Sequence, residues 1–222
     1  MKNVSASSAP NRKGRLLIAI PKEIIFGFQF VARQSAARLV RLRVSPNAIS
    51  FFGFLVGVAA GALFAFDHPV WAGALVIASG VLDMVDGLVA VNSHRKSLTG
   101  AIFDSTLDRY SEFFVYLGLS YHFRGSWALW LPFFAFLGSF MVSYTRARAE
   151  GLGIDCRVGL MQRAERITLI SAGALAGGIF RVFDIAMIIA LAAIALVSNF
   201  TAFQRVHYVR KIETQMKKIK EA

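Results

Sequence analysis

Four aspartates form two pairs whose spacing could support metal chemistry. Asp83 and Asp86 are three positions apart, and Asp104 and Asp108 are four apart. On a helix, either spacing places both carboxylates of a pair on one face. If two antiparallel helices joined by the loop 92–99 carry them, the four acids converge in one pocket and require a counter-ion. Carboxylate oxygens suit Mg²⁺ or Mn²⁺, and such a cluster can hold two ions that clamp a displacement at phosphorus.

The position of these acids leaves two functional classes open. Ionisable groups inside apolar segments mark catalytic sites, and they equally mark proton or cation pathways. The acids alone therefore support a metal-dependent enzyme and a cation transporter alike. A purely structural role, with Arg109 or other cations neutralising the aspartates, is disfavoured because few basic residues lie between the four acids.

The segments that carry these residues are too apolar for a soluble domain. Of 222 residues, 56% are hydrophobic and 17% are charged, and the mean hydropathy is +0.55. A bilayer core requires about 20 apolar residues per helix, and long apolar runs without alternation are not barrel strands. We therefore predict an all-α integral membrane protein with six transmembrane helices. Three predicted spans are uncharged (47–66, 127–145, 185–204), and three contain or begin with charges (69–91, 100–123, 162–180).

The distribution of lysine and arginine predicts the orientation. With six spans, most basic residues fall on the side that carries both termini, and the positive-inside rule makes that side cytoplasmic. We expect a multi-pass protein of the cell (inner) membrane, with both termini and the aspartates cytoplasmic. Topology and contact with anionic lipids then explain the net charge of +12, so no nucleic-acid partner is expected. We predict no cleaved signal peptide, and the single cysteine excludes an internal disulfide.

We divide the chain into three parts. Residues 1–44 form a basic arm, disordered over 1–15, and an interfacial amphipathic helix. In that helix apolar residues are mixed with arginines at helical spacing: Ile24, Ile25, Phe28, Val31 and Leu39 with Arg33, Arg38 and Arg41. A simple basic anchor without substrate contact remains an alternative for that helix. Residues 45–205 form one six-helix catalytic domain, which Ser45 and Pro46 begin with a helix-start signal. Residues 206–222 form a basic cytoplasmic tail.

The spacing of acids and small residues resembles the signature of the CDP-alcohol phosphotransferase family. The matching positions are Asp83, Asp86, Gly87, Ala90, Gly100, Asp104 and Asp108. The resemblance covers nearly the whole chain, and it implies a six-helix enzyme of phospholipid biosynthesis, commonly a homodimer. Such an enzyme transfers a phosphatidyl-type group from a CDP-linked lipid (CDP-diacylglycerol or an archaeal-type equivalent) to an alcohol and releases CMP. One position departs from the pattern: Val91 stands where the family has an arginine expected to contact the donor, so an inactive lipid-binding relative stays open.

The resemblance also implies residue roles. Asp83, Asp86 and Asp104 would hold Mg²⁺ or Mn²⁺, in two ions, and Asp108 would contact a metal and remove the acceptor's proton. The donor site would comprise Pro46, Asn47, Gly87, Ala90, Ser97 and Gly100.

A second group of residues bears on the acceptor. The segments 143–150 and 159–166 look like those of the subgroup that transfers to inositol phosphate, which implies a phosphorylated polyol as acceptor. The candidates for its phosphate are Ser143, Arg146, Arg166 and Arg205. Ser143 and Arg146 share a helix face, and the planar fork of arginine suits a phosphate dianion. Glycerol phosphate would satisfy the same charges, and the arginines could instead be membrane anchors or partners of Glu150 and Glu165.

Overall fold

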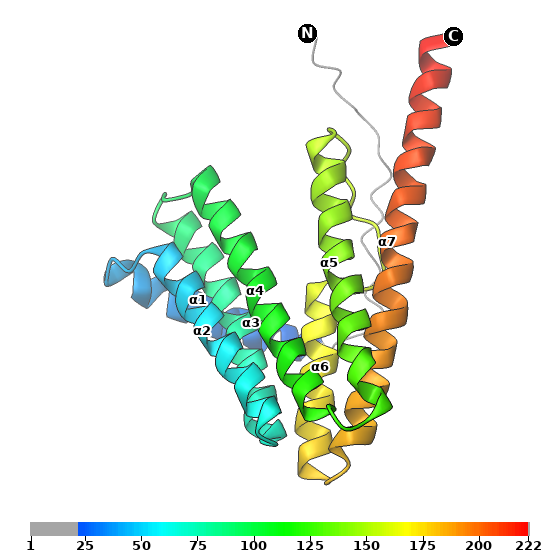
Figure 1. Cartoon of the computed structure of the whole chain (residues 1–222). Coiled ribbons are helices and arrows are strands. Elements are labelled where there is room, and N and C mark those ends of the chain that lie inside the picture. The colour runs from blue at the N-terminus through cyan, green and yellow to red at the C-terminus, as the bar shows by residue number, and fades with distance from the viewer. Residues whose placement is uncertain (1–21, 222) are drawn as a thin grey trace.

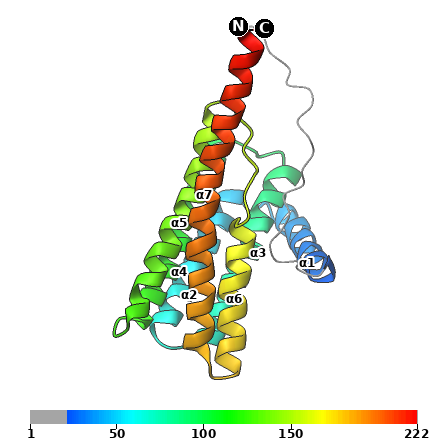
Figure 2. The ribbon, with the colours of Figure 1, turned by 90° about the vertical axis from the view of Figure 1, so that its right-hand side faces the viewer.

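The computed structural model describes residues 22–221, with side chains described for 30–219. The described residues are helical and contain no strand. The elements are α1 (Lys22–Arg41), α2 (Pro46–Ala65), α3 (Pro69–Asn92), α4 (Leu98–His122), η1 (Trp127–Leu129), α5 (Trp130–Gly151), α6 (Arg163–Ile179) and α7 (Phe183–Glu221). Figure 1 shows α2, α3 and α4 meeting α5, α6 and α7 at the lower end of the view, while α4 diverges from α5 and α7 toward the upper end; Figure 2 shows the same bundle from its side.

Two serines fix where the site-bearing end of the bundle begins. The Ser45 hydroxyl accepts a hydrogen bond from the Ala48 amide at 3.3 Å, and Pro46 occupies the first turn of α2. The Ser97 hydroxyl accepts from the Gly100 amide at 3.0 Å at the start of α4. Both hydroxyls satisfy amide groups that the first turn of a helix leaves without partners.

Glycines bring α2 and α4 into backbone contact. A Cβ added at Gly118 would lie 1.9 Å from the Gly61 carbonyl oxygen, and one at Gly57 would lie 1.9 Å from the Ser111 hydroxyl. Only glycine permits this approach, as is common where membrane helices pack. The contact fixes α4, with Asp104 and Asp108 near its start, against α2.

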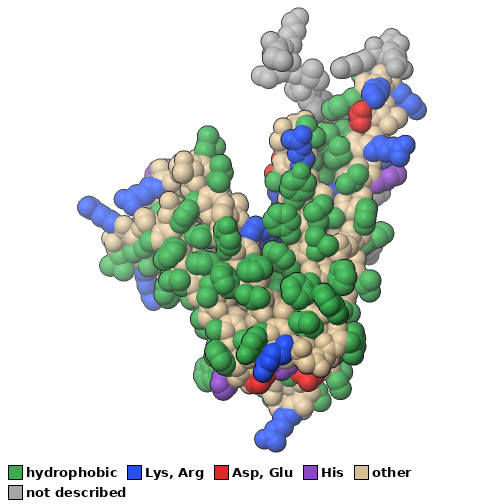
Figure 3. All heavy atoms as spheres, in the orientation of Figure 1, with side chains coloured by type: hydrophobic (Ala, Val, Ile, Leu, Met, Phe, Trp, Pro, Cys, Tyr) green, Lys and Arg blue, Asp and Glu red, His purple; other side chains and the backbone are tan. Residues whose placement is uncertain are grey.

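Apolar side chains fill the bundle core and also cover its outside. The core includes Phe64, Tyr116, Leu119, Leu191 and Ile194. Hydrophobic side chains extend over much of the visible surface in Figure 3, as expected for a protein whose outer face contacts lipid. The prediction of an all-α membrane protein is thus confirmed.

Four of the six predicted spans have the length and apolar character to cross a bilayer by themselves. They are Pro46–Ala65, Pro69–Asn92, Trp127–Gly151 and Phe183–Ile219. Of the other two, α4 carries several charges and α6 has 17 residues. Both pack within the bundle, α4 against α2 and α6 against α3 and α7. The six-span topology therefore remains a prediction.

The two ends of the chain add helix to this bundle. Ala32 and Ala36 of α1 are buried in a small core with Ile49, Val85 and Val89. Residues 1–21 and the side chains of Ile24, Ile25 and Phe28, on which our N-terminal predictions partly rest, lie outside the described residues. At the other end, α7 continues unbroken through the predicted boundary at 205/206 and extends beyond the other helices (Figures 1 and 2).

Candidate metal and substrate site

Three of the four aspartates converge at the end of α3 and the start of α4. Asp83, Asp104 and Asp108 each offer a carboxylate oxygen, and these oxygens all lie within 4.8 Å of one another. All three side chains are partly buried. The neighbouring helices α3 and α4 thus concentrate negative charge in one place.

Asp86 lies in the same pocket but turns toward α2. It is 4% exposed, and its Oδ2 accepts a hydrogen bond of 2.6 Å from the Ser50 hydroxyl. The pocket is lined by all four aspartates together with Ser50, Gly53, Phe54, Ser79, Leu107, Ser111 and Arg163. The convergence expected from the sequence spacing is therefore present in the structure.

The donor set fits a hard divalent cation. Mg²⁺ holds its oxygen ligands at about 2.0–2.1 Å, so ligands on opposite sides of one ion stand about 4 Å apart. Three carboxylate oxygens within 4.8 Å of one another are compatible with that shell. Their repulsion without a cation gives a physical reason for an ion to bind.

An arginine from a third helix reaches into the acids. Arg163 begins α6, and its Nη1 lies 2.8 Å from Asp83 Oδ1 and also donates to Asp108. Our sequence reasoning considered Arg109 as a neutralising cation, but Arg109 Nη2 is 4.0 Å from Asp108 Oδ2. Sequence reasoning missed Arg163. The one available signal was its position three residues before Arg166, which places both on one helix face.

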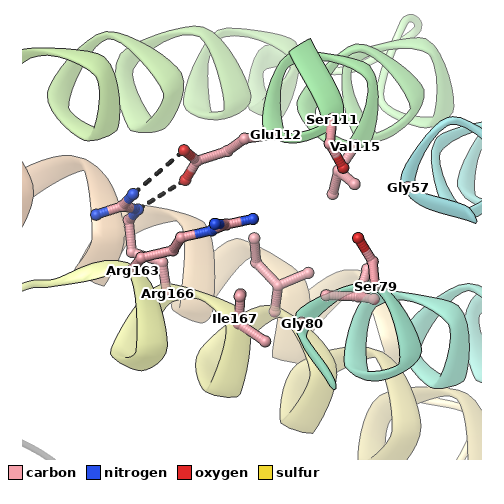
Figure 4. Close-up of a pocket in the computed structure, with 11 residues that line it drawn as sticks. Gly57, Ser79, Gly80, Ser111, Glu112, Val115, Arg163, Arg166 and Ile167 are labelled. Atoms are coloured by element: carbon pink, nitrogen blue, oxygen red, sulfur yellow. Dashed lines mark hydrogen bonds and ion pairs between the residues drawn. The ribbon is translucent and has the colours of Figure 1, made fainter. Parts of the chain in front are cut away.

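Next to the acids lies a buried network of ionic groups (Figure 4). Arg166 is 1% exposed, and its Nε and Nη2 donate to Glu112 at 2.7 and 3.2 Å. Arg109 Nη1 lies 3.3 Å from Glu112 and also donates to the Ser143 hydroxyl at 2.6 Å. Glu112 and Arg109 had not been predicted as site residues. The network joins two predicted acceptor residues, Ser143 and Arg166.

One atom of this network stands out because it has no partner. Arg166 Nη1 is buried and makes no hydrogen bond within the described part of the chain. A buried guanidinium nitrogen without a partner is costly. An anion bound beside Arg166 would satisfy it.

The other two predicted acceptor residues are engaged differently. Arg146 pairs with Glu150 at 2.9 Å and is 44% exposed, as the ion-pair alternative anticipated. Arg205 is 3% exposed; its Nε donates to the Val158 carbonyl at 2.8 Å, and its Nη1 donates to the Val142 carbonyl. Arg205 therefore ties α7 to the residue that precedes Ser143.

The predicted donor residues gather at the starts of α2 and α4 and along α3. A Cβ at Gly100 would lie 3.3 Å from Asn47 Oδ1 and 2.9 Å from the Ser97 hydroxyl, so these residues adjoin one another. A Cβ at Gly87, by contrast, would have no atom of the chain within 4 Å. Packing does not require glycine at position 87, which leaves room there for a ligand. Figure 3 shows the surface hollowed between the start of α4 and the end of α5, with basic side chains at the base of the hollow.

The single cysteine is not a candidate nucleophile. Cys156 lies buried in the connection between α5 and α6, and this burial raises the pKa of its thiol. A thiol of this kind stays protonated at neutral pH and is inert.

The fold is that of a membrane transferase family. The sequence pattern of the CDP-alcohol phosphatidyltransferase family matches residues 43–204, and the chain belongs to that family. The resemblance inferred from the aspartates and glycines is confirmed. Of the enzyme and transporter hypotheses, the family membership supports the enzyme.

Two relatives are named as synthases of inositol phosphate lipids. The chain is 42% identical over 170 residues to an archaetidylinositol phosphate synthase from Methanothermobacter thermautotrophicus, covering 76% of this chain and 85% of the relative. It is 31% identical over 188 residues to a phosphatidylinositol phosphate synthase from Mycobacteroides abscessus, covering 82% and 85%.

Solved structures of the Mycobacterium tuberculosis phosphatidylinositol phosphate synthase share the fold. One, with CDP-DAG bound, has a TM-score of 0.74 and 27% identity, covering 81% of this chain and 93% of that one. Another, in complex with manganese and citrate, has a TM-score of 0.73 and 26% identity, covering 80% and 88%.

Proposed function

We infer that the chain transfers a phosphatidyl-type group from a CDP-linked lipid to inositol phosphate and releases CMP. The observation that carries this inference is the convergence of Asp83, Asp104 and Asp108 beside a buried arginine network. Acids that hold a cation suit a diphosphate donor, and arginines suit a phosphorylated acceptor. The CDP-DAG held by the mycobacterial structure and the names of the relatives support the same pair of substrates.

The four aspartates hold the metal ions in this proposal. Asp83, Asp86, Asp104 and Asp108 would bind two Mg²⁺ or Mn²⁺ ions, and the manganese in the mycobacterial relative supports this choice of metal. When bound, these ions supply positive charge that neutralises the diphosphate and the departing CMP. Ser50 holds the Asp86 carboxylate toward α2, so the protein orients this carboxylate before any substrate binds.

Asp108 is the group best placed to move a proton. It belongs to the acid cluster and lies on α4 one turn before Glu112, which binds Arg166 in the arginine network. The acceptor's hydroxyl oxygen attacks the phosphorus attached to the lipid, and Asp108 accepts the hydroxyl proton. The bond from that phosphorus to the bridging oxygen breaks, and the electron pair leaves with CMP. Positioning and electrostatics therefore carry most of the catalysis.

The donor would lie across the starts of α2 and α4 and against α3. Its contacts would come from Pro46, Asn47, Gly87, Ala90, Ser97 and Gly100. Gly87 supports this placement because its exposed backbone offers close approach without a Cβ. The lipid chains would remain in the bilayer, which the apolar outer face of the bundle adjoins.

The acceptor's phosphate would lie among Ser143, Arg146, Arg166 and Arg205. Arg166 Nη1 supports this placement, because a phosphate oxygen would give that buried donor the partner it lacks. Glycerol phosphate carries the same dianion, so it is the alternative acceptor for these residues.

The membrane arrangement follows from the same scheme. Helices α4 and α6 complete six spans, α1 lies at the membrane interface, and both termini and the site face the cytoplasm of a cell (inner) membrane. We infer a homodimer, as the family resemblance implies.

An acceptor panel tests the proposed function. The purified protein is given a CDP-linked lipid, Mn²⁺ or Mg²⁺, and in turn inositol phosphate, glycerol phosphate, inositol, glycerol and serine, with CMP release as the readout. We expect CMP release with inositol phosphate that Asp108→Asn abolishes while the protein still elutes as a folded species. Turnover with unphosphorylated alcohols alone would contradict the acceptor assignment, and CMP release by Asp108→Asn at the wild-type rate would remove the proton-accepting role.

A further inference from the structure

Arg163 stands where the acid cluster needs a cation. Its Nη1 bridges Asp83, at 2.8 Å, and Asp108, so that one guanidinium from α6 joins acids of α3 and α4. Asp83 and Asp108 are two of the three aspartates whose oxygens lie within 4.8 Å of one another. Asp104 and Asp86 receive no hydrogen bond from Arg163.

A guanidinium and a divalent ion compete for the same pair of carboxylates. Each carboxylate has lone pairs enough for both partners, but two cations at one place repel each other. A divalent ion that takes Asp83 and Asp108 as ligands therefore disfavours Nη1 of Arg163 at its position between them. Arg163 lowers the repulsion among the acids without metal, and it also opposes metal binding.

A second pocket beside the acids can accommodate the displaced guanidinium. Arg163 lines the acid pocket and also the neighbouring pocket, which contains Glu112 and Arg166. Figure 4 shows Arg163 and Arg166 extending from α6 toward α4 in that second pocket. Glu112 lines that second pocket as well, so a guanidinium that leaves the aspartates would keep an acidic neighbour there.

We propose that Arg163 is a displaceable internal counter-ion that couples metal binding to phosphate binding. Without metal it neutralises Asp83 and Asp108. Divalent ions displace it toward Arg166, where its charge joins the site for a phosphate anion. Because the coupling between two ligands is reciprocal, phosphate in turn tightens metal binding. This inference rests on the metal site of the proposed function and assigns Arg163 a positioning role within it.

The test measures Mn²⁺ binding to the full chain in detergent, by the electron paramagnetic resonance signal of free Mn²⁺. Titrations are run with and without inorganic phosphate and corrected by a protein-free titration for the Mn²⁺ that phosphate binds. Arg163→Gln removes the internal cation. Arg157→Gln is the matched control, because Arg157 is 77% exposed and, among the residues whose side chains are described, pairs with Asp155 in the same connection.

In the wild type and the control, we expect phosphate to tighten Mn²⁺ binding by about fivefold or more, the lower end of usual coupling. Arg163→Gln should bind Mn²⁺ more tightly than wild type without phosphate and should lose most of the phosphate effect. Arg163→Gln with wild-type or weaker Mn²⁺ affinity and unchanged coupling would overturn the proposal. If Arg163→Gln does not fold, the wild-type titration decides, because no effect of phosphate there overturns the proposal as well.

A different result would contradict the proposed function rather than the role of Arg163. If the wild type binds no Mn²⁺ and Asp104→Asn behaves identically, the acid cluster is not a metal site. If the wild type binds Mn²⁺ and Asp104→Asn does not, the metal site stands and only the role of Arg163 is in question.

Discussion

The Ser50 hydroxyl donates a hydrogen bond of 2.6 Å to Asp86 Oδ2 and joins α2 to α3 beside the acid cluster. Ser50 also approaches the Pro46 carbonyl at 3.2 Å, within its own helix. A serine on a neighbouring helix thus decides where the most buried of the four aspartates points. Such partners of ligating carboxylates commonly affect metal affinity almost as much as the ligands do.

Ser50→Ala should weaken Mn²⁺ binding by about 10- to 100-fold, the usual effect of losing such a partner, because Asp86 loses its orienting donor. The Mn²⁺ titration measures this. Ser93→Ala is the control, since the Ser93 hydroxyl donates to the Val89 carbonyl of its own helix at 2.7 Å and touches no aspartate. Equal Mn²⁺ affinity in Ser50→Ala and Ser93→Ala would show that Asp86 needs no orienting partner.

Gly87→Ala should not lower the thermal unfolding midpoint, because its new methyl group would touch no atom of the described chain and alanine is favoured over glycine inside a helix. It should raise the KM for the CDP-linked lipid, because the methyl group would stand where the donor is proposed to bind. Gly61→Ala is the opposite case, since its Cβ would lie 2.2 Å from the Phe114 carbonyl oxygen. That overpacking should cost about 1–3 kcal/mol of stability. Thermal unfolding in detergent and donor kinetics separate the two effects. A wild-type KM in Gly87→Ala would place the nucleotide elsewhere.

Arg146→Gln should raise the KM for inositol phosphate several-fold and leave the KM for the lipid donor unchanged. Arg146 is exposed and pairs with the exposed Glu150, so this change should not disturb the fold. Arg148→Gln, an exposed arginine two positions later on α5, is the matched control. Equal acceptor kinetics in the two variants would leave Arg146 as a surface ion pair only.

At the opposite end of the bundle, His122 joins three segments. Its Nδ1 lies 2.5 Å from Asp67 Oδ1, its Nε2 lies 2.8 Å from Asp184 Oδ1, and its ring packs edge-on against Phe123 and Phe183. His122→Ala should lower stability by about 1–3 kcal/mol, seen as a lower thermal midpoint with Mn²⁺ affinity intact. His207→Ala, at an exposed position on α7, should change neither. A wild-type midpoint in His122→Ala would show that the contacts contribute no stability.

Local spacing was enough to predict the acid pocket, because two pairs at helical spacing on adjoining helices can meet in only a few ways. The helix start at Pro46 also followed from local chemistry, since Ser45 caps it. The sequence alone could not place Arg163, which meets Asp83 across 80 positions and Asp108 across 55. Such contacts depend on how α6 packs against α3, and that packing is set by side-chain shape over whole helices.

The arginine network could not be predicted from the sequence for a related reason. The resemblance pointed to Ser143, Arg146, Arg166 and Arg205, but nothing in the sequence shows that Arg109 and Glu112 would join Ser143 to Arg166. Likewise, an apolar run ending near 204 gives no sign that α7 continues to Glu221, because a polar helix without a partner face has no distinct periodic pattern.

The anomalous scattering of manganese in crystals grown with Mn²⁺ tests the metal site most directly. We predict a peak bonded to carboxylate oxygens of Asp83, Asp104 and Asp108, with the Arg163 guanidinium withdrawn from Asp83. A peak elsewhere on the bundle would contradict the account. So would the absence of a peak, if the same protein binds Mn²⁺ in the solution titration.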